Sequence, residues 1–160
     1  MSSVLLTRDL AREAVELVEP SVIRLFETRA KRPCFHIVVL DPTVYPWEAR
    51  FEEAILYEHS FRKNDWDKDY GAIARSKAVQ SWRDGRGMPN ILHHELAPAS
   101  LQAGDVEAWS SFHWYGLTVA GSGVQRWFDF MIGGWVALAC QMLARDEAEA
   151  VRNDPNRSSY

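Results

Sequence analysis

The chain has 160 residues, 47% of them apolar, and a formal net charge of −4. This length is typical of one domain, and the intermixed charges provide no basic patch for nucleic acid or for an anionic membrane. The longest apolar run, Phe130–Cys140, is shorter than the roughly 20 residues that span a membrane, and the N-terminus lacks an export signal. We therefore expect a cytoplasmic protein with one domain over residues 1–152 and a frayed tail over residues 153–160.

Short motifs exclude several large enzyme classes. The chain lacks a Gly-x-Ser-x-Gly elbow, a phosphate-binding loop, a dinucleotide-binding fingerprint and a zinc-protease helix. Its two cysteines, Cys34 and Cys140, lie in separate apolar runs without the spacing of metal ligands. This pattern favours reduced, buried thiols over a disulfide or a metal site.

The first predicted element is a helix that begins after Thr7, whose side chain can cap it. It ends at Lys31-Arg32-Pro33. Pro20 must kink this helix or start a second helical segment, because proline removes a backbone donor.

Two antiparallel strands are predicted next. Cys34–Leu40 is almost entirely apolar and rich in β-branched residues, which predicts a central strand covered on both faces. Within it, His36 fits a hydrogen-bonded core histidine better than a ligand or a catalytic base. Phe51–Phe61 mixes apolar and acidic residues and predicts a strand with one wet face.

Asp69 can cap a helix over Tyr70–Trp82. Arg75 and Lys77 on this helix are expected to point in different directions. For both side chains a solvated helix face is the simpler interpretation, and the functional alternative is an anchor for a ligand's carboxylate.

A long irregular connection is predicted from Asp84 to Gly104, and connections of this length inside a domain are usually functional lids or mobile segments. It carries the densest group of titratable residues in the chain: Arg86, His93, His94 and Glu95. Either histidine could be a general base, with Arg75, Lys77 or Arg86 holding a substrate carboxylate. A polar surface loop is the other interpretation.

The chain then becomes strongly aromatic, with Trp109, His113, Trp114 and Tyr115. Such residues are more often part of a core than of a ligand site. Phe112–Ala120 predicts a buried strand, which Gly121-Ser122-Gly123 ends. This turn would expose backbone N–H groups at the start of the next helix, where a carboxylate could bind beside Ser122. A turn selected only for its tight geometry is the simpler interpretation.

A long helix is predicted over Val124–Leu143, where apolar residues recur on two adjoining stripes. A monomer of this size covers one stripe, and the other would expose an apolar patch of roughly several hundred Å². We therefore predict a homo-oligomer through this helix, most simply a symmetric dimer in which Gly133-Gly134 lets two helices approach. A charged residue in place of Met131 or Trp135 is expected to dissociate it or to precipitate the protein.

The run Gly-Leu-Thr-Val-Ala-Gly-Ser-Gly, over residues 116–123, passes directly into that helix. This arrangement resembles the closing unit of the GlcG/HbpS-like family, also called the haem-degrading domain family. Ala72–Ala78 resembles the family's Ala-x-x-Lys-Ala helix and places Lys77 on its recurrent lysine, and Phe35–Asp41 resembles its first strand.

The resemblance implies a single α/β domain with an antiparallel sheet of about five strands in a profilin- or PAS-like arrangement. The first and last helices are expected to pack on the sheet. The resemblance also implies an oligomer with a ligand site between subunits.

The sequence supports two functions. The resemblance implies a non-enzymatic binding or accessory protein that holds haem or another planar or carboxylate-bearing small molecule. Its candidate ligand-binding residues are Lys77, Arg75, Arg86, Trp109, His113, Trp114 and Ser122, and His93, His94 or His113 could be an axial ligand to haem. The alternative is a small cofactor-independent lyase, isomerase or hydrolase that acts on a small organic acid, with His93 or His94 as the base.

Overall fold

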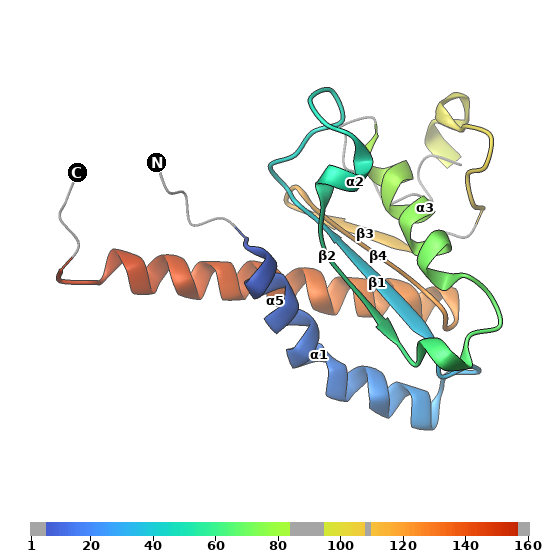
Figure 1. Ribbon diagram of the computed structural model, residues 1–160, viewed down its shortest axis with the longest axis horizontal. Coiled ribbons are helices and arrows are strands. Elements are labelled where there is room, and N and C mark those ends of the chain that lie inside the picture. The colour runs from blue at the N-terminus through green and yellow to red at the C-terminus, as the bar shows by residue number, and fades with distance from the viewer. Residues whose placement is uncertain (1–5, 84–94, 108–109, 157–160) are drawn as a thin grey trace.

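The structure is a computed structural model that describes residues 6–83, 95–107 and 110–156 (Figure 1). It is an α+β fold with helices on both faces of one antiparallel sheet. In chain order the described elements are α1 (Arg8–Thr28), β1 (Phe35–Leu40), α2 (Phe51–Ala54), β2 (Ile55–Phe61), η1 (Lys63–Asp65), α3 (Tyr70–Trp82), η2 (Pro98–Ser100), β3 (Ser111–Trp114), β4 (Leu117–Ser122) and α5 (Arg126–Arg152).

The sheet contains four strands in the order β2-β1-β4-β3, and every neighbouring pair is antiparallel. The described part of the chain thus has four strands where the sequence predicted about five. All six residues of β1 are buried, and β1 lies between β2 and β4. This confirms the predicted central strand and its antiparallel pairing with the next strand.

Alternating side chains of β1 contact different layers. Phe35, Ile37 and Val39 belong to the larger core, which α1 and α5 cover on one face of the sheet. Val38 and Leu40 pack against α3 on the other face. In Figure 1, α1 and α5 lie on the side of the sheet away from α3, and the C-terminal half of α5 extends beyond the sheet.

Two predicted strands need correction. Residues 112–120 form a hairpin instead of one strand, because Tyr115 and Gly116 have φ of 49° and 83° and reverse the chain between β3 and β4. The first four residues of the predicted strand Phe51–Phe61 form the short helix α2. There Glu53 Oε2 accepts a 2.8 Å hydrogen bond from the backbone N–H of Arg50, which favours a helical turn.

Both predicted helix caps are confirmed. The Thr7 hydroxyl accepts from the backbone N–H of Leu10 at 3.2 Å, and Asp69 accepts from the N–H of Ala72 at 2.9 Å. Pro20 lies inside α1 and does not divide it. Pro20 and Glu16 are both exposed, so water can reach the Glu16 carbonyl, which lacks its usual donor.

The glycine pair in α5 lies against strands of its own chain. A Cβ on Gly133 would stand 3.4 Å from the carbonyl oxygen of Val119, and one on Gly134 would stand 3.1 Å from the Phe112 ring. The two glycines therefore allow α5 to approach the backbone of β4, as the expected close approach required. A contact with a second copy of the chain is not needed to explain Gly133 and Gly134. By length and composition α5 could also cross a membrane, a property that it shares with core helices of soluble proteins.

Candidate functional site

The structure separates the residues that the sequence singled out. Arg86, His93, His94 and Trp109 lie outside the described residues. The other predicted ligand residues are spread over three elements: Arg75 and Lys77 on α3, His113 and Trp114 on β3, and Ser122 on β4.

Lys77 is 1% exposed, so the prediction of a solvated side chain is wrong for this residue. Its ammonium group donates to Ser110 Oγ at 2.7 Å, to the carbonyl oxygen of Gly121 at 2.8 Å and to Asp129 Oδ2 at 3.3 Å. Burial lowers the pKa of Lys77, despite Asp129, and raises the pKa of Asp129 to about 6. These contacts join α3, β4 and α5, which makes Lys77 a structural cation in the core.

His113 and Trp114 do not form one site. The Nδ1 atom of His113 lies 2.9 Å from the Thr118 hydroxyl, and burial lowers the pKa of His113. His113 lines a cavity of about 280 Å³ together with Asp41 and other residues, whereas Trp114 does not line it. Successive strand residues point to opposite faces, which explains the separation.

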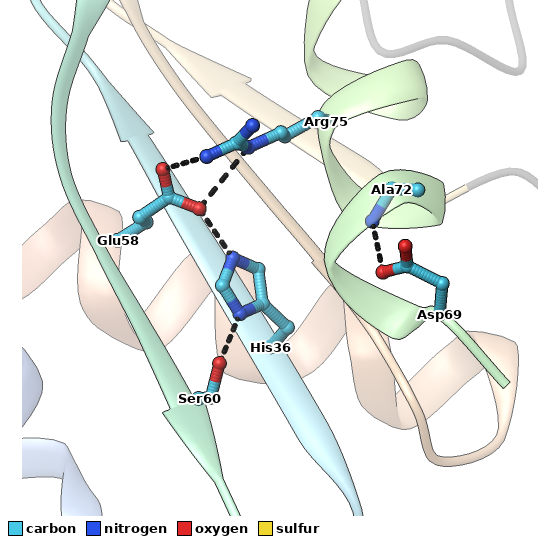
Figure 2. Close-up of polar contacts among 6 residues, drawn as sticks. All are labelled: His36, Glu58, Ser60, Asp69, Ala72 and Arg75. Carbon is cyan, nitrogen blue, oxygen red and sulfur yellow. Dashed lines mark hydrogen bonds and ion pairs between the residues drawn. The ribbon is translucent and has the colours of Figure 1, made fainter. Parts of the chain in front are cut away.

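A different cluster forms where β1, β2 and α3 meet (Figure 2). The His36 ring lies between Ser60 and Glu58, with 2.7 Å from Nδ1 to Ser60 Oγ and 2.7 Å from Nε2 to Glu58 Oε1. Arg75 then binds both carboxylate oxygens of Glu58, at 3.1 Å through Nε and 2.5 Å through Nη2. Four side chains from three elements therefore form one continuous hydrogen-bonded chain.

Strand register and a helix cap place these residues. His36 is directly opposite Ser60 in the β1–β2 pair, and Glu58 is two residues before Ser60 and shares its face. On the other side, Asp69 fixes the first turn of α3. Gly71 in that turn lies near the imidazole, because a Cβ there would stand 3.8 Å from the His36 ring.

The hydrogen bonds define the protonation of the cluster. Burial alone would raise the pKa of Glu58, but the bonds from Arg75 and His36 outweigh it and lower this pKa, so Glu58 is an ionised acceptor. Burial lowers the pKa of His36, although Glu58 opposes this shift, so the ring is neutral near pH 7. Nε2 therefore carries the proton and donates to Glu58, and Nδ1 accepts from the Ser60 hydroxyl.

A cavity of about 310 Å³ borders this chain. It is lined by His36, Glu58, Ser60, Lys63, Trp66, Asp69, Gly71, Ala72 and Arg75. His36 is buried, Ser60 is half-buried, and the Arg75 side chain is about half exposed. Water and a small solute can thus reach one end of the chain while the imidazole is held in place.

The sequence identified Arg75 but missed the rest of this site. His36 was interpreted as a hydrogen-bonded core histidine, and its burial and bonds confirm that part. The sequence placed Glu58 and Ser60 only within a predicted strand with one solvent-facing side and gave neither a role. The usable signal was the spacing of two polar residues on that face, but their convergence on His36 depends on the strand register.

The described residues do not favour a metal or a haem. They contain no group of three or more His, Cys, Asp or Glu side chains that could hold a metal ion. Cys34 and Cys140 are free and buried, as predicted. The cavity at His113 is small and includes Asp41 in its lining, so it does not fit a large apolar macrocycle.

Comparison with known proteins found no match: no protein-family model, curated protein or solved structure matches the chain. The resemblance to the GlcG/HbpS-like family stays a prediction from short motifs. The geometry of the described residues is therefore the main basis for inferring a function.

Proposed function

We propose that this protein is a small-molecule-binding or accessory protein of the GlcG/HbpS type, and that its ligand is a small organic acid bound beside Arg75. The observation that carries the proposal is the Ser60–His36–Glu58–Arg75 chain, which borders a cavity of about 310 Å³. A profilin- or PAS-like arrangement and a cytoplasmic location belong to the same proposal and rest on the sequence patterns.

The lining of this cavity carries two carboxylates, Glu58 and Asp69, and two cations that can pair with the carboxylate of a ligand. Lys63 supplies a cation, and Nη1 of Arg75 has no acceptor among the described residues. Trp66 provides an apolar wall, because its indole N–H donates to the Phe61 carbonyl at 3.0 Å and its ring meets the His36 ring edge-on at 5.8 Å. Ligand sites usually measure about 300–1,000 Å³, so this cavity favours a small acid over a haem.

Replacing Arg75 with glutamine should weaken binding of the acid about tenfold or more, because a charge-assisted hydrogen bond is lost. Calorimetric titration of the full chain with acetate, pyruvate, succinate and citrate measures this effect. Lys63→Gln is the second variant, since it removes a cation without breaking the contact with Glu58. Arg24→Gln is the matched control, because Arg24 lies on α1 with an exposed side chain and does not line the cavity. No binding by any of the acids, or equal affinity in all variants, contradicts the proposal.

A specific observation also favours the alternative function, a small cofactor-independent enzyme. That function requires a histidine that converges with a cation, and Glu58 joins His36 to Arg75. His36 then takes the role of base that the sequence had assigned to His93 or His94.

We also propose a homo-oligomer through α5. Trp127, Leu138 and Met142 are 57%, 42% and 54% exposed and lie on one side of the helix, at spacings of eleven and four residues. Ile132 and Val136 on the opposite side are buried in the core. A second copy of this face is the simplest cover for such an apolar stripe.

The double variant Leu138→Glu and Met142→Glu should halve the mass of a dimer, because it would bring four like charges into the interface. Size-exclusion chromatography with light scattering measures the mass. These positions are better probes than Met131 and Trp135, which are partly buried against the core of their own chain. Leu17→Glu on α1 is the control, since Leu17 is also exposed. A monomeric unmodified chain at micromolar concentration would contradict the oligomer.

A further inference from the structure

We propose that Ser60 is a nucleophile, that His36 is its general base, and that the cavity hydrolyses esters of small organic acids. This inference rests on the proposed function, because the acyl group of the substrate would occupy the cavity assigned to the acid. The geometry that supports it is the 2.7 Å contact between the Ser60 hydroxyl and a ring nitrogen whose partner nitrogen is held by a carboxylate.

The three side chains satisfy the requirements for an activated hydroxyl. A serine needs an adjacent base, and that base needs a third group to fix its tautomer. Glu58 fixes the tautomer of His36, and the two bonds from Arg75 hold Glu58 in turn. In this cluster Nδ1 of His36 is the base, and Nε2 contacts the Glu58 carboxylate. Either ring nitrogen of a histidine can accept or donate a proton, so either can fill either role.

The reaction balances with water as the only co-reactant. Ser60 Oγ bonds to the carbonyl carbon of the ester while its proton moves to Nδ1 of His36. The carbon–oxygen bond to the alcohol then breaks, and the alcohol takes that proton. Water attacks the acyl-serine, His36 accepts its proton and returns it to Ser60 Oγ, and the free acid is released. Glu58 stabilises the imidazolium that forms transiently.

Two groups in the lining of this cavity can stabilise the oxyanion of each tetrahedral intermediate. The backbone N–H of Gly71 has no acceptor among the described residues and belongs to the first turn of α3, where the helix dipole is positive. The cation of Lys63 lines the same cavity. An acyl group that also carries a carboxylate could pair with Arg75, so half-esters of dicarboxylic acids are the favoured substrates.

A fluorophosphonate probe tests the nucleophile directly in the unmodified chain. We expect peptide mass spectrometry to find the adduct on Ser60 and on no other serine, including the exposed Ser21 of α1. An adduct that is absent from Ser60 overturns the inference. This measurement needs no variant and therefore does not depend on how a substitution affects folding.

Hydrolysis of p-nitrophenyl acetate and of monoethyl succinate provides the second readout. Ser60→Ala should lower the rate at least about 100-fold, while Ser21→Ala should leave it unchanged. The wild-type rate should rise with pH through a midpoint below 6.5, because burial lowers the pKa of His36 and only the neutral ring accepts a proton. An unchanged rate in Ser60→Ala overturns the inference.

The two proposals for this cavity fail separately. Binding of free acids that depends on Arg75, combined with an unlabelled Ser60, refutes the nucleophile and leaves the binding function standing. A labelled Ser60 with no binding of any acid supports the nucleophile and refutes the binding function.

Discussion

Replacement of Asp129 with alanine is expected to lower the free energy of unfolding by about 3–5 kcal/mol, because it leaves the buried ammonium of Lys77 without its carboxylate. Lys77 and Asp129 are only 1% and 4% exposed in their side chains, and their charged atoms are 3.3 Å apart. Asp129 Oδ1 also accepts from the backbone N–H of Val124 at 3.1 Å, so the same variant weakens the start of α5.

Urea unfolding of the full chain near pH 7 measures this loss. The double variant Lys77→Met and Asp129→Leu should recover the part of the loss that comes from the unpaired ammonium, because an apolar pair of similar volume removes the cost of burying both charges. The bond from the Val124 N–H stays lost in both variants. Arg145→Met is the control, since the Arg145–Glu149 pair is exposed and should contribute less than about 1 kcal/mol. A loss below about 1 kcal/mol in Asp129→Ala would show that the pair does not stabilise the core.

Gly123→Ala is expected to cost about 3 kcal/mol or more and to reduce the yield of soluble protein. Gly123 has φ of 145°, a conformation that L side chains rarely adopt, and an added Cβ would overlap the carbonyl oxygen of Cys34. The obstacle is backbone, so it cannot rotate away. The carbonyl oxygen of Gly123 also accepts a 3.1 Å hydrogen bond from Arg32 Nε, which ties the turn to the start of β1.

Thermal and urea unfolding measure the free energy of unfolding of the soluble Gly123→Ala protein. The yield of soluble protein is compared with that of the unmodified chain. Gly104→Ala is the matched control, because Gly104 has φ of 90° but nothing within 4 Å of an added Cβ. It should lose only about 1 kcal/mol from backbone strain. Similar losses in the two variants would mean that steric overlap at Cys34 contributes little.

Local sequence patterns predicted the elements that depend on near neighbours. The almost entirely apolar sequence of β1 required burial on both faces, and the structure places it inside the sheet. Thr7 and Asp69 were identified as caps because a cap acts on a backbone N–H only three residues away. The helical spacing of apolar residues likewise located α5, which begins within two residues of Val124.

Sequence patterns predicted less well the features that depend on a turn conformation or on a partner far away in the chain. Aromatic and β-branched residues favoured one strand over residues 112–120, but positive φ at Tyr115 and Gly116 produced a hairpin. Lys77 looked like a surface residue because its helix alone gave no sign of a partner. That partner, Asp129, lies 52 residues further along the chain.

The sequence by itself therefore determined a buried strand, three long helices, free thiols and an apolar surplus on α5, because burial and helix formation follow from composition and short-range spacing. Only the tertiary structure decided which polar groups meet. His36 reaches Ser60 through the register of β1 and β2, and Glu58 joins it to Arg75 because α3 packs over that face of the sheet. Such contacts depend on the pairing of segments far apart in the chain, and no local pattern encodes that pairing.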